Sequence, residues 1–273
     1  MTPDEETIRS RANPLFKRFR ALKVRGGAKV CLLEGPRLLG EALAAEVKIE
    51  EVAVTPAAEE HPAVATTLAT LRGRGVPVRR LAAGLIASLS EAATTQGVLA
   101  LAHPPASDEK RLFSGRPLVV VADAVQDPGN LGGLLRTAEA AGASGAYLTA
   151  GCADPFSWRA LRGSMGSALR LPMIRGLAAE EVLDRLEERG VRVFATTADG
   201  ETRYDEADLT GPTALVFGRE SSGLSAPLAQ RTSARLRIPL AAGVESLNVG
   251  VAAGLVLYEA ARQRGFPSGA RDR

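Results

Sequence analysis

The sequence has 273 residues, of which 45% are apolar and 24% are charged, and its net charge at neutral pH is +3. These values are typical of a globular protein with one large domain or two ordinary ones. The most apolar stretch, residues 249–258, is too short to span a bilayer, and the acidic residues 4–6 argue against a signal peptide. We therefore expect a cytoplasmic protein that is not attached to a membrane.

The first hundred residues predict a small α/β domain. Asn13-Pro14 opens a basic amphipathic helix, and strands and helices alternate after it. The expected strands are residues 29–33, 49–54, 76–79 and 96–102, and the expected helices are residues 37–45, 62–72 and 82–88. This pattern indicates a three-layer α/β unit.

Basic residues are concentrated at the start of this domain. They are Arg9, Arg11, Lys17, Arg18, Arg20, Lys23, Arg25 and Lys29. Such a cluster suits the phosphate backbone of a nucleic acid, although a solvated helix face is the alternative interpretation. Aromatic residues make up only 4% of the chain, so base stacking on aromatic platforms is not expected to dominate recognition.

A second domain follows a linker. Residues 103–110 are rich in proline, small and charged residues, so we divide the chain into a domain at 1–106, a linker at 107–115 and a domain at 116–273. Strands are expected at residues 118–122, 146–149, 191–196, 213–217 and 235–238, with helices between them that include 179–189 and 251–261. The alternation predicts a mostly parallel sheet with helices on both faces.

Three polar loops follow strands of this second domain. They are residues 127–136, 217–225 and 240–250, and each leads into a helix. In open parallel sheets, ligands bind beyond the carboxyl ends of the strands. The sequence therefore predicts a binding site where these three loops converge.

Residue types limit the chemistry of this site. The only two histidines, His61 and His103, precede the second domain, which excludes a histidine base there. The two cysteines, Cys31 and Cys152, have no metal-ligand spacing around them, and we expect no metal. Dinucleotide binding is not supported either, because residues 129–133 lack the G-x-G-x-x-G spacing.

The three loops resemble the three signature motifs of the SpoU family, the S-adenosylmethionine-dependent RNA 2′-O-ribose methyltransferases of the SPOUT superfamily. Residues 130–136 are similar to the first motif, residues 217–225 to the second and residues 238–249 to the third. The third motif departs from the usual pattern, with Leu240 in place of Met, Ala242 in place of Gly and Gly250 in place of Ser. Of these, the resemblance implies that Ala242 adds a methyl group where the backbone is expected to approach the cofactor, which would modestly change cofactor affinity.

The resemblance implies roles for individual residues. The implied catalytic residues are Arg136, Asn130, Glu220, Ser246 and Asn248, and the implied contacts to S-adenosylmethionine are Gly218, Ile238 and Leu247. A guanidinium stays protonated in proteins, so we expect Arg136 to orient a phosphate and stabilise the developing alkoxide rather than act as a base. A structural salt bridge is the alternative for Arg136, and helix capping alone is the alternative for Ser246.

The resemblance also implies an architecture and a substrate. It implies a C-terminal trefoil knot, a homodimer and an N-terminal RNA-binding domain similar to small ribosomal proteins, carried by Asn13-Pro14, residues 33–35 and residues 95–98. The expected reaction is methyl transfer to a ribose 2′-hydroxyl of RNA, with 23S ribosomal RNA as substrate. Transfer RNA as substrate, and an RNA-binding protein without catalysis, remain open as alternatives.

Overall fold

A computed structural model describes residues 7–25, 29–91, 94–219 and 223–266. The chain divides into two compact units. The first comprises Met1–Pro105 and Phe156–Arg170, and the second comprises Ala106–Pro155 and Leu171–Arg273. The sequence-based division, which assigned residues 156–170 to the C-terminal domain, remains a prediction.

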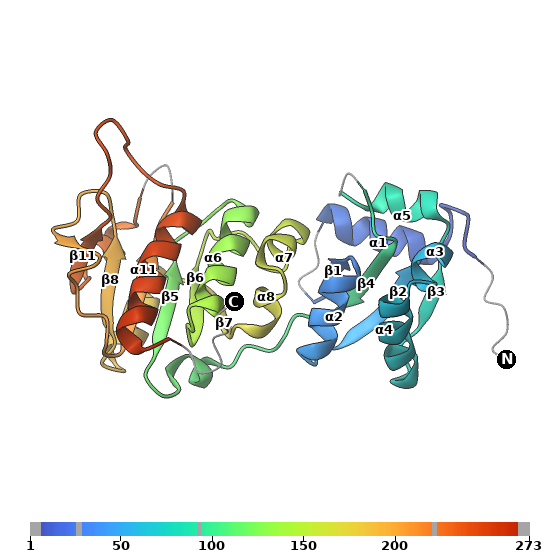
Figure 1. The fold of residues 1–273 in the computed structure, drawn as a ribbon, viewed down its shortest axis with the longest axis horizontal. Coiled ribbons are helices and arrows are strands. Elements are labelled where there is room, and N and C mark those ends of the chain that lie inside the picture. Colours follow the sequence, from blue (N-terminus) through green and yellow to red (C-terminus); the bar gives the residue numbers. More distant parts are fainter. Residues whose placement is uncertain (1–6, 26–28, 92–93, 220–222, 267–273) are drawn as a thin grey trace. The chain divides into compact units, whose positions relative to one another are not determined.

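The first unit contains a four-stranded sheet in the order β1-β4-β2-β3 (Figure 1). Its strands are β1 (Cys31–Glu34), β2 (Ile49–Val54), β3 (Val78–Arg80) and β4 (Val98–Ala102). Strand β4 pairs antiparallel with β1 and β2, whereas β2 and β3 are parallel. The helices are α1 (Pro14–Arg25), α2 (Pro36–Ala44), α3 (Pro56–Glu59), α4 (Pro62–Gly73), α5 (Ala83–Leu89), α7 (Trp158–Ser164) and α8 (Ser167–Arg170).

Helix α1 begins where the sequence predicts it. The Asn13 side chain accepts a hydrogen bond from the Leu15 amide at 2.9 Å, and Pro14 occupies a position whose missing N–H costs nothing. Phe16 and Phe19 face the same side of the helix and pack into the apolar core of this unit, while Lys17 remains exposed. The apolar side of the predicted amphipathic helix is therefore the buried side, and Lys17 on its polar side faces the solvent.

The second unit contains a seven-stranded sheet in the order β7-β6-β5-β10-β8-β11-β9, and all its pairings are parallel. The strands are β5 (Leu118–Ala122), β6 (Gly145–Thr149), β7 (Met173–Leu177), β8 (Arg192–Thr196), β9 (Thr202–Arg203), β10 (Thr213–Phe217) and β11 (Ala234–Arg237). The helices are η1 (Glu109–Phe113), α6 (Pro128–Ala140), α9 (Ala179–Glu187), α10 (Ala226–Gln230) and α11 (Val249–Arg264). The predicted parallel α/β fold is confirmed, whereas the edge strands β7 and β9 were not predicted.

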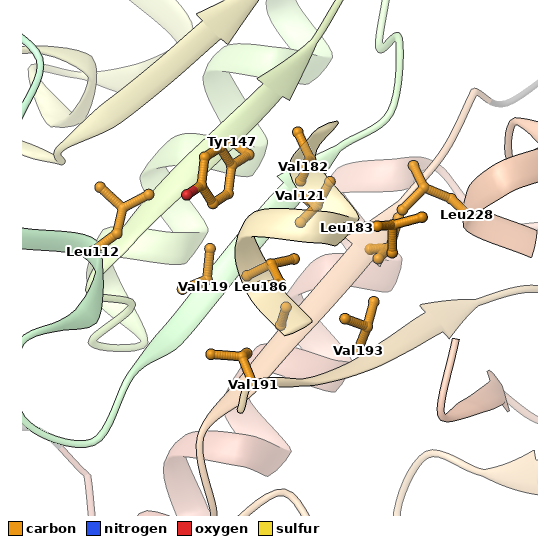
Figure 2. Close-up of a cluster of buried hydrophobic side chains, with 12 residues drawn as sticks. Leu112, Val119, Val121, Tyr147, Val182, Leu183, Leu186, Val191, Val193 and Leu228 are labelled. Carbon is orange, nitrogen blue, oxygen red and sulfur yellow. The ribbon is translucent and has the colours of Figure 1, made fainter. Parts of the chain in front are cut away.

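The two faces of this sheet are covered by different helices. Val119 and Val121 of β5 pack with Leu183 and Leu186 of α9 in one apolar cluster, which also includes Tyr147 (Figure 2). Side chains alternate along a strand, so the intervening residues of β5 point to the opposite face. Helices α6 and α11 lie side by side on the sheet (Figure 1) and contact β6 and β10, respectively. Both faces are therefore buried, which explains why β5 and residues 214–217 of β10 are continuous apolar runs.

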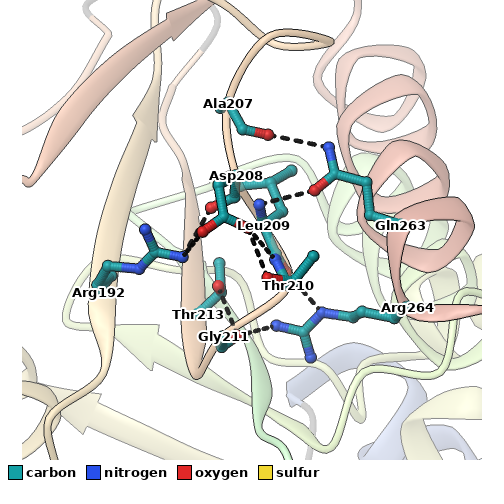
Figure 3. Close-up of polar contacts among 9 residues, drawn as sticks. All are labelled: Arg192, Ala207, Asp208, Leu209, Thr210, Gly211, Thr213, Gln263 and Arg264. Atoms are coloured by element: carbon teal, nitrogen blue, oxygen red, sulfur yellow. Dashed lines mark hydrogen bonds and ion pairs between the residues drawn. The ribbon is translucent and has the colours of Figure 1, made fainter.

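The end of α11 is attached to the loop before β10 by a network of polar contacts (Figure 3). The Arg264 guanidinium donates to the carbonyls of Leu209 at 2.8 Å and Gly211 at 2.5 Å, and to those of Arg116 and Pro117 at 3.1 Å each. Burial lowers the pKa of Arg264 to about 10. The helix then ends at Gly265 in a left-handed conformation, with φ of 83°.

Within residues 7–25, 29–91, 94–219 and 223–266, no helix combines the length and the apolar character that are needed to cross a membrane.

Candidate active site

The three polar loops leave the sheet at the same edge. The first follows β5, the second follows β10 beside it, and the third follows β11, which is separated from β10 only by β8. Because all pairings are parallel, the carboxyl ends of these strands lie together. The predicted convergence of the loops is built into this strand order.

A side-chain hydrogen bond joins the first loop to the third. Asp127 caps α6 by accepting a hydrogen bond from the Asn130 amide at 2.8 Å. Asn248 caps α11 by accepting from the Gly250 amide at 3.0 Å, and its side-chain amide donates to Oδ1 of Asn130, also at 3.0 Å. Both asparagines therefore lie where two helices begin, and the helix N-termini approach each other there.

A cavity of about 460 Å³ lies among the loops that follow β8, β10 and β11. Gly218, Ile238 and Leu247, the residues predicted to contact the cofactor, all line it, and so does Ser246. Ile238 and Leu247 are half-buried and present apolar surface to the cavity, whereas Ser246 is exposed at it. The structure thus brings four of the predicted site residues to one cavity.

Gly218 is required by close packing of the second loop. A Cβ added to Gly218 would lie 2.5 Å from the carbonyl oxygen of Gly223 and 2.8 Å from the Leu224 side chain. Such distances are too short for non-bonded atoms, and one of the obstacles is backbone that cannot rotate away. The cavity wall at this position can be formed only by a residue without a side chain.

The loop after β8 supplies polar groups that the sequence interpretation missed. The hydroxyls of Thr196 and Thr197 are buried and have no hydrogen-bond partner among the described residues, and both threonines line the cavity. Buried polar atoms in proteins are nearly always partnered. Thr196 ends β8 and Thr197 follows it, so their position at the carboxyl end of a parallel strand could have identified them as candidate site residues.

Arg136 is not part of the cavity wall. It lies on the exposed side of α6, and within the described residues it forms no hydrogen bond or ion pair. The salt bridge considered as an alternative for Arg136 is thus absent from this part of the chain. Glu220 lies outside the described residues. No cluster of potential metal ligands occurs among the residues that the structure describes.

Comparisons with known proteins identify the family. The model of the SpoU rRNA methylase family matches residues 117–258, more than half of the chain. The chain belongs to the SpoU rRNA methylase family. The model of the MRM3-like substrate binding domain matches residues 13–100, and the resemblance seen in the sequence motifs is confirmed.

Relatives of this SpoU protein include named RNA methyltransferases. An uncharacterised tRNA/rRNA methyltransferase of Synechocystis is 36% identical over 268 residues, which are 97% of this chain and 96% of the relative. The 23S rRNA (guanosine(2553)-2′-O)-methyltransferase RlmP of Bacillus subtilis is 33% identical over 243 residues, which are 89% of this chain and 93% of the relative.

Solved structures agree with the SpoU assignment over both units. The SpoU methyltransferase AviRb of Streptomyces viridochromogenes, in complex with AdoMet, has a TM-score of 0.84 and 30% identity, and the match covers 92% of this chain and 98% of that one. The AdoMet-bound rRNA methyltransferase of Sinorhizobium meliloti also has a TM-score of 0.84, with 32% identity over 94% of this chain and 97% of that one. The predicted cofactor, S-adenosylmethionine, is confirmed at the level of the family.

Proposed function

We propose that this SpoU protein transfers the methyl group of S-adenosylmethionine to a ribose 2′-hydroxyl of 23S ribosomal RNA in the cytoplasm. The observation that carries the proposal is the convergence of three motif-bearing loops beside a cavity with two unpartnered threonine hydroxyls. Relatives named as 23S rRNA 2′-O-methyltransferases, RlmP of Bacillus subtilis and RlmB of Pseudomonas syringae, support the substrate class.

The cavity residues fit S-adenosylmethionine. A volume of about 460 Å³ is within the range of small-molecule sites, and the lining combines apolar and polar groups. Ile238 and Leu247 would pack against the adenine, while the hydroxyls of Thr196 and Thr197 would hydrogen-bond polar atoms of the cofactor. When bound, the cofactor supplies a methyl group already activated by its sulfonium sulfur.

The protein then has to position the ribose and stabilise charge. In the proposed mechanism Arg136 binds the phosphate next to the target ribose, stabilises the alkoxide that develops at the 2′-oxygen, and leaves the phosphate to accept the proton. Asn130 and Asn248 hold the first and third loops together through their shared hydrogen bond. Ser246 contacts the cofactor or ribose, and Glu220 orients Arg136 or the adjacent backbone.

A homodimer is part of the proposal. Val251, Leu255 and Tyr258 recur at helical spacing on α11 and are 53%, 39% and 47% exposed, so they form one apolar face. We propose that the same face of a second copy covers it, in an active site that draws on both subunits. This arrangement agrees with the position of Arg136, which is exposed on α6 beside α11 and does not line the cavity of its own subunit.

The dimer is tested by sedimentation with a charge placed on this face. Tyr258→Glu is expected to convert a dimer into a monomer, because an unpaired buried charge is costly in an apolar interface. Lys110→Glu on η1 is the matched control and is expected to leave the dimer intact. A wild-type protein that sediments as a monomer at micromolar concentration would contradict the proposal.

The N-terminal region is proposed to bind RNA. Lys17 and Arg20 are exposed on α1, whereas Arg18 is held at 2.5 Å by Glu50, so part of the basic cluster is already neutralised. Counterion release makes phosphate binding weaken steeply with salt. We also propose, from the family resemblance, a C-terminal trefoil knot, which an experimental structure traced through α11 would test. The composition of the linker supports the proposed division into a domain at 1–106, a linker at 107–115 and a domain at 116–273.

Methyl transfer itself is tested with methyl-labelled S-adenosylmethionine and, separately, unmodified 23S ribosomal RNA and transfer RNA. We expect label in ribosomal RNA at one position that then resists alkaline cleavage. Arg136→Ala should lower kcat about 100- to 1,000-fold with cofactor affinity unchanged, as for the loss of one charge-stabilising donor. Arg111→Ala, at an exposed arginine of η1, is the control.

The remaining outcomes separate the alternatives. If the methyl label appears in transfer RNA and not in ribosomal RNA, the substrate is transfer RNA. Absence of cofactor binding would favour an RNA-binding protein that keeps the fold without catalysis. Unchanged activity in Arg136→Ala would remove Arg136 from the mechanism.

A further inference from the structure

The buried acid Asp123 is attached to both ends of the second motif loop. It follows β5 and is 3% exposed. Its backbone amide donates to the Phe217 carbonyl at 2.9 Å, where the loop begins, and its Oδ2 accepts from the Ser225 amide at 2.6 Å, where the loop ends. Asp123 therefore holds both Phe217 and Ser225, although it lies more than ninety positions before them in the chain.

The orientation of the Asp123 carboxyl group is fixed from its other side. Thr149, at the end of β6, donates its hydroxyl hydrogen to Oδ1 of Asp123 at 3.2 Å. The Thr149 oxygen in turn accepts from the Ala124 amide at 2.9 Å. Ala124 has a left-handed φ of 50°, so the chain turns away from the sheet directly after the acid. The carboxyl group is thus a fixed acceptor anchored to two strands.

The described residues of the second motif form one wall of the cavity. Gly218, Gly223 and Leu224 line it, and the backbones of Arg219 and Gly223 exchange two hydrogen bonds of 3.0 Å. Because Gly223 and Leu224 pack within van der Waals contact of Gly218, a shift at Ser225 is passed to the cavity wall. The geometry of the wall depends on where the Ser225 amide is held.

We propose that Asp123 is a positioning residue for S-adenosylmethionine, which acts by holding Gly223 and Leu224 of the cavity wall in place through the Ser225 amide. The inference rests on the proposed function, because it takes the cavity to be the cofactor site. Asp123 does not line the cavity, so its effect on binding is indirect. It contributes to affinity by keeping Gly223 and Leu224 in place before the cofactor arrives, which lowers the ordering cost of binding.

The chain offers a matched control at the same contact. The Ser225 hydroxyl is buried without a partner among the described residues, whereas its backbone amide makes the bond to Asp123. Ser225→Ala therefore keeps the contact, and Asp123→Ala removes it. Asp123→Asn is intermediate, because its single side-chain oxygen can accept from Ser225 or from Thr149 but its amide nitrogen cannot accept from either.

The test is calorimetric titration of S-adenosylmethionine into the full-length wild-type protein and the three variants, well below their unfolding temperatures. We expect Asp123→Ala to raise Kd about tenfold, Asp123→Asn about threefold and Ser225→Ala less than about twofold. In the methylation assay KM for the cofactor should rise while kcat at saturating cofactor changes less than about twofold, since Asp123 touches no reacting group.

The outcomes distinguish this inference from the proposed function. If a folded Asp123→Ala protein binds S-adenosylmethionine with the wild-type Kd, the role of Asp123 is overturned and the proposed function is not. The same holds if Kd rises as much in Ser225→Ala as in Asp123→Ala. If Asp123→Ala does not fold, wild-type Kd in Asp123→Asn overturns it. Absence of binding by the wild-type protein overturns the proposed function and this inference with it.

Discussion

The attachment of α11 through Arg264 leads to a prediction about stability. Replacing Arg264 with methionine keeps the length of the side chain and removes all four hydrogen bonds to the carbonyls of residues 116, 117, 209 and 211. Hydrogen bonds from a charged donor contribute about 1.5–3 kcal/mol each. Desolvation of the guanidinium, which also lowers its pKa, offsets part of that sum. We expect a net loss of about 3 kcal/mol in the free energy of unfolding.

Arg264→Lys separates charge from geometry. A lysine ammonium is a single point charge and cannot reach four carbonyls at once, so about half of the loss should remain. Urea unfolding followed by far-UV circular dichroism measures both variants. The only tryptophan, Trp158, lies in the first unit and is a poor reporter of this attachment. In thermal unfolding, about 3 kcal/mol corresponds to a fall of about 10 °C.

The pH dependence gives an independent check. The folded-state pKa of Arg264, about 10, lies below its ordinary value, so above about pH 10 the unfolded chain binds more protons and the wild type gains stability with pH. Below about pH 9 the residue is protonated in both states, and the difference between wild type and Arg264→Met should be constant. A stability loss under about 0.5 kcal/mol, or full rescue by lysine, would refute the reasoning.

Three further predictions concern single contacts. Gly218→Ala should weaken cofactor binding at least about tenfold in calorimetry, because its methyl group meets backbone at 2.5 Å; unchanged affinity would contradict the close packing. A double-mutant cycle of Asn130→Ala and Asn248→Ala should give a coupling energy of about 0.5–1 kcal/mol in urea unfolding, and strict additivity would contradict the bond between them. Tyr147→Phe should cost about 1 kcal/mol because the phenol donates to Glu109 at 2.5 Å. Burial and the Glu109 hydrogen bond raise the pKa of Tyr147, so this cost should shrink as pH rises above about 10, and a constant cost would argue against it.

The central strands were predictable from the sequence because both of their sides are buried. Residues 118–122 and 214–217 are uninterrupted apolar runs, and they coincide with β5 and with all of β10 except its first residue, Thr213. The edge strand β7 was missed because it contains Arg175 and Gly176 and is mostly exposed after Met173. An edge strand needs no continuous apolar pattern, so periodicity does not reveal it.

The site was predictable only as far as its motifs extend. Gly218, Ile238 and Leu247 lie together at the cavity, and their contact with the cofactor stays a prediction from the loop sequences. Thr196 and Thr197 were not predicted, because their position at the cavity depends on strand order, which places β8 between β10 and β11. No local pattern in the sequence specifies that order.

The same strand order has a consequence for how the chain is synthesised. Strand β10 lies between β5 and β8, yet it is translated after both. The open edge of β5 must therefore wait for roughly a hundred further residues, which takes about 5–20 s on the ribosome. Throughout that interval a fully apolar strand has no partner on one side, and such edges pair readily with other chains. The nascent protein thus depends on protection from aggregation until Phe217 has emerged.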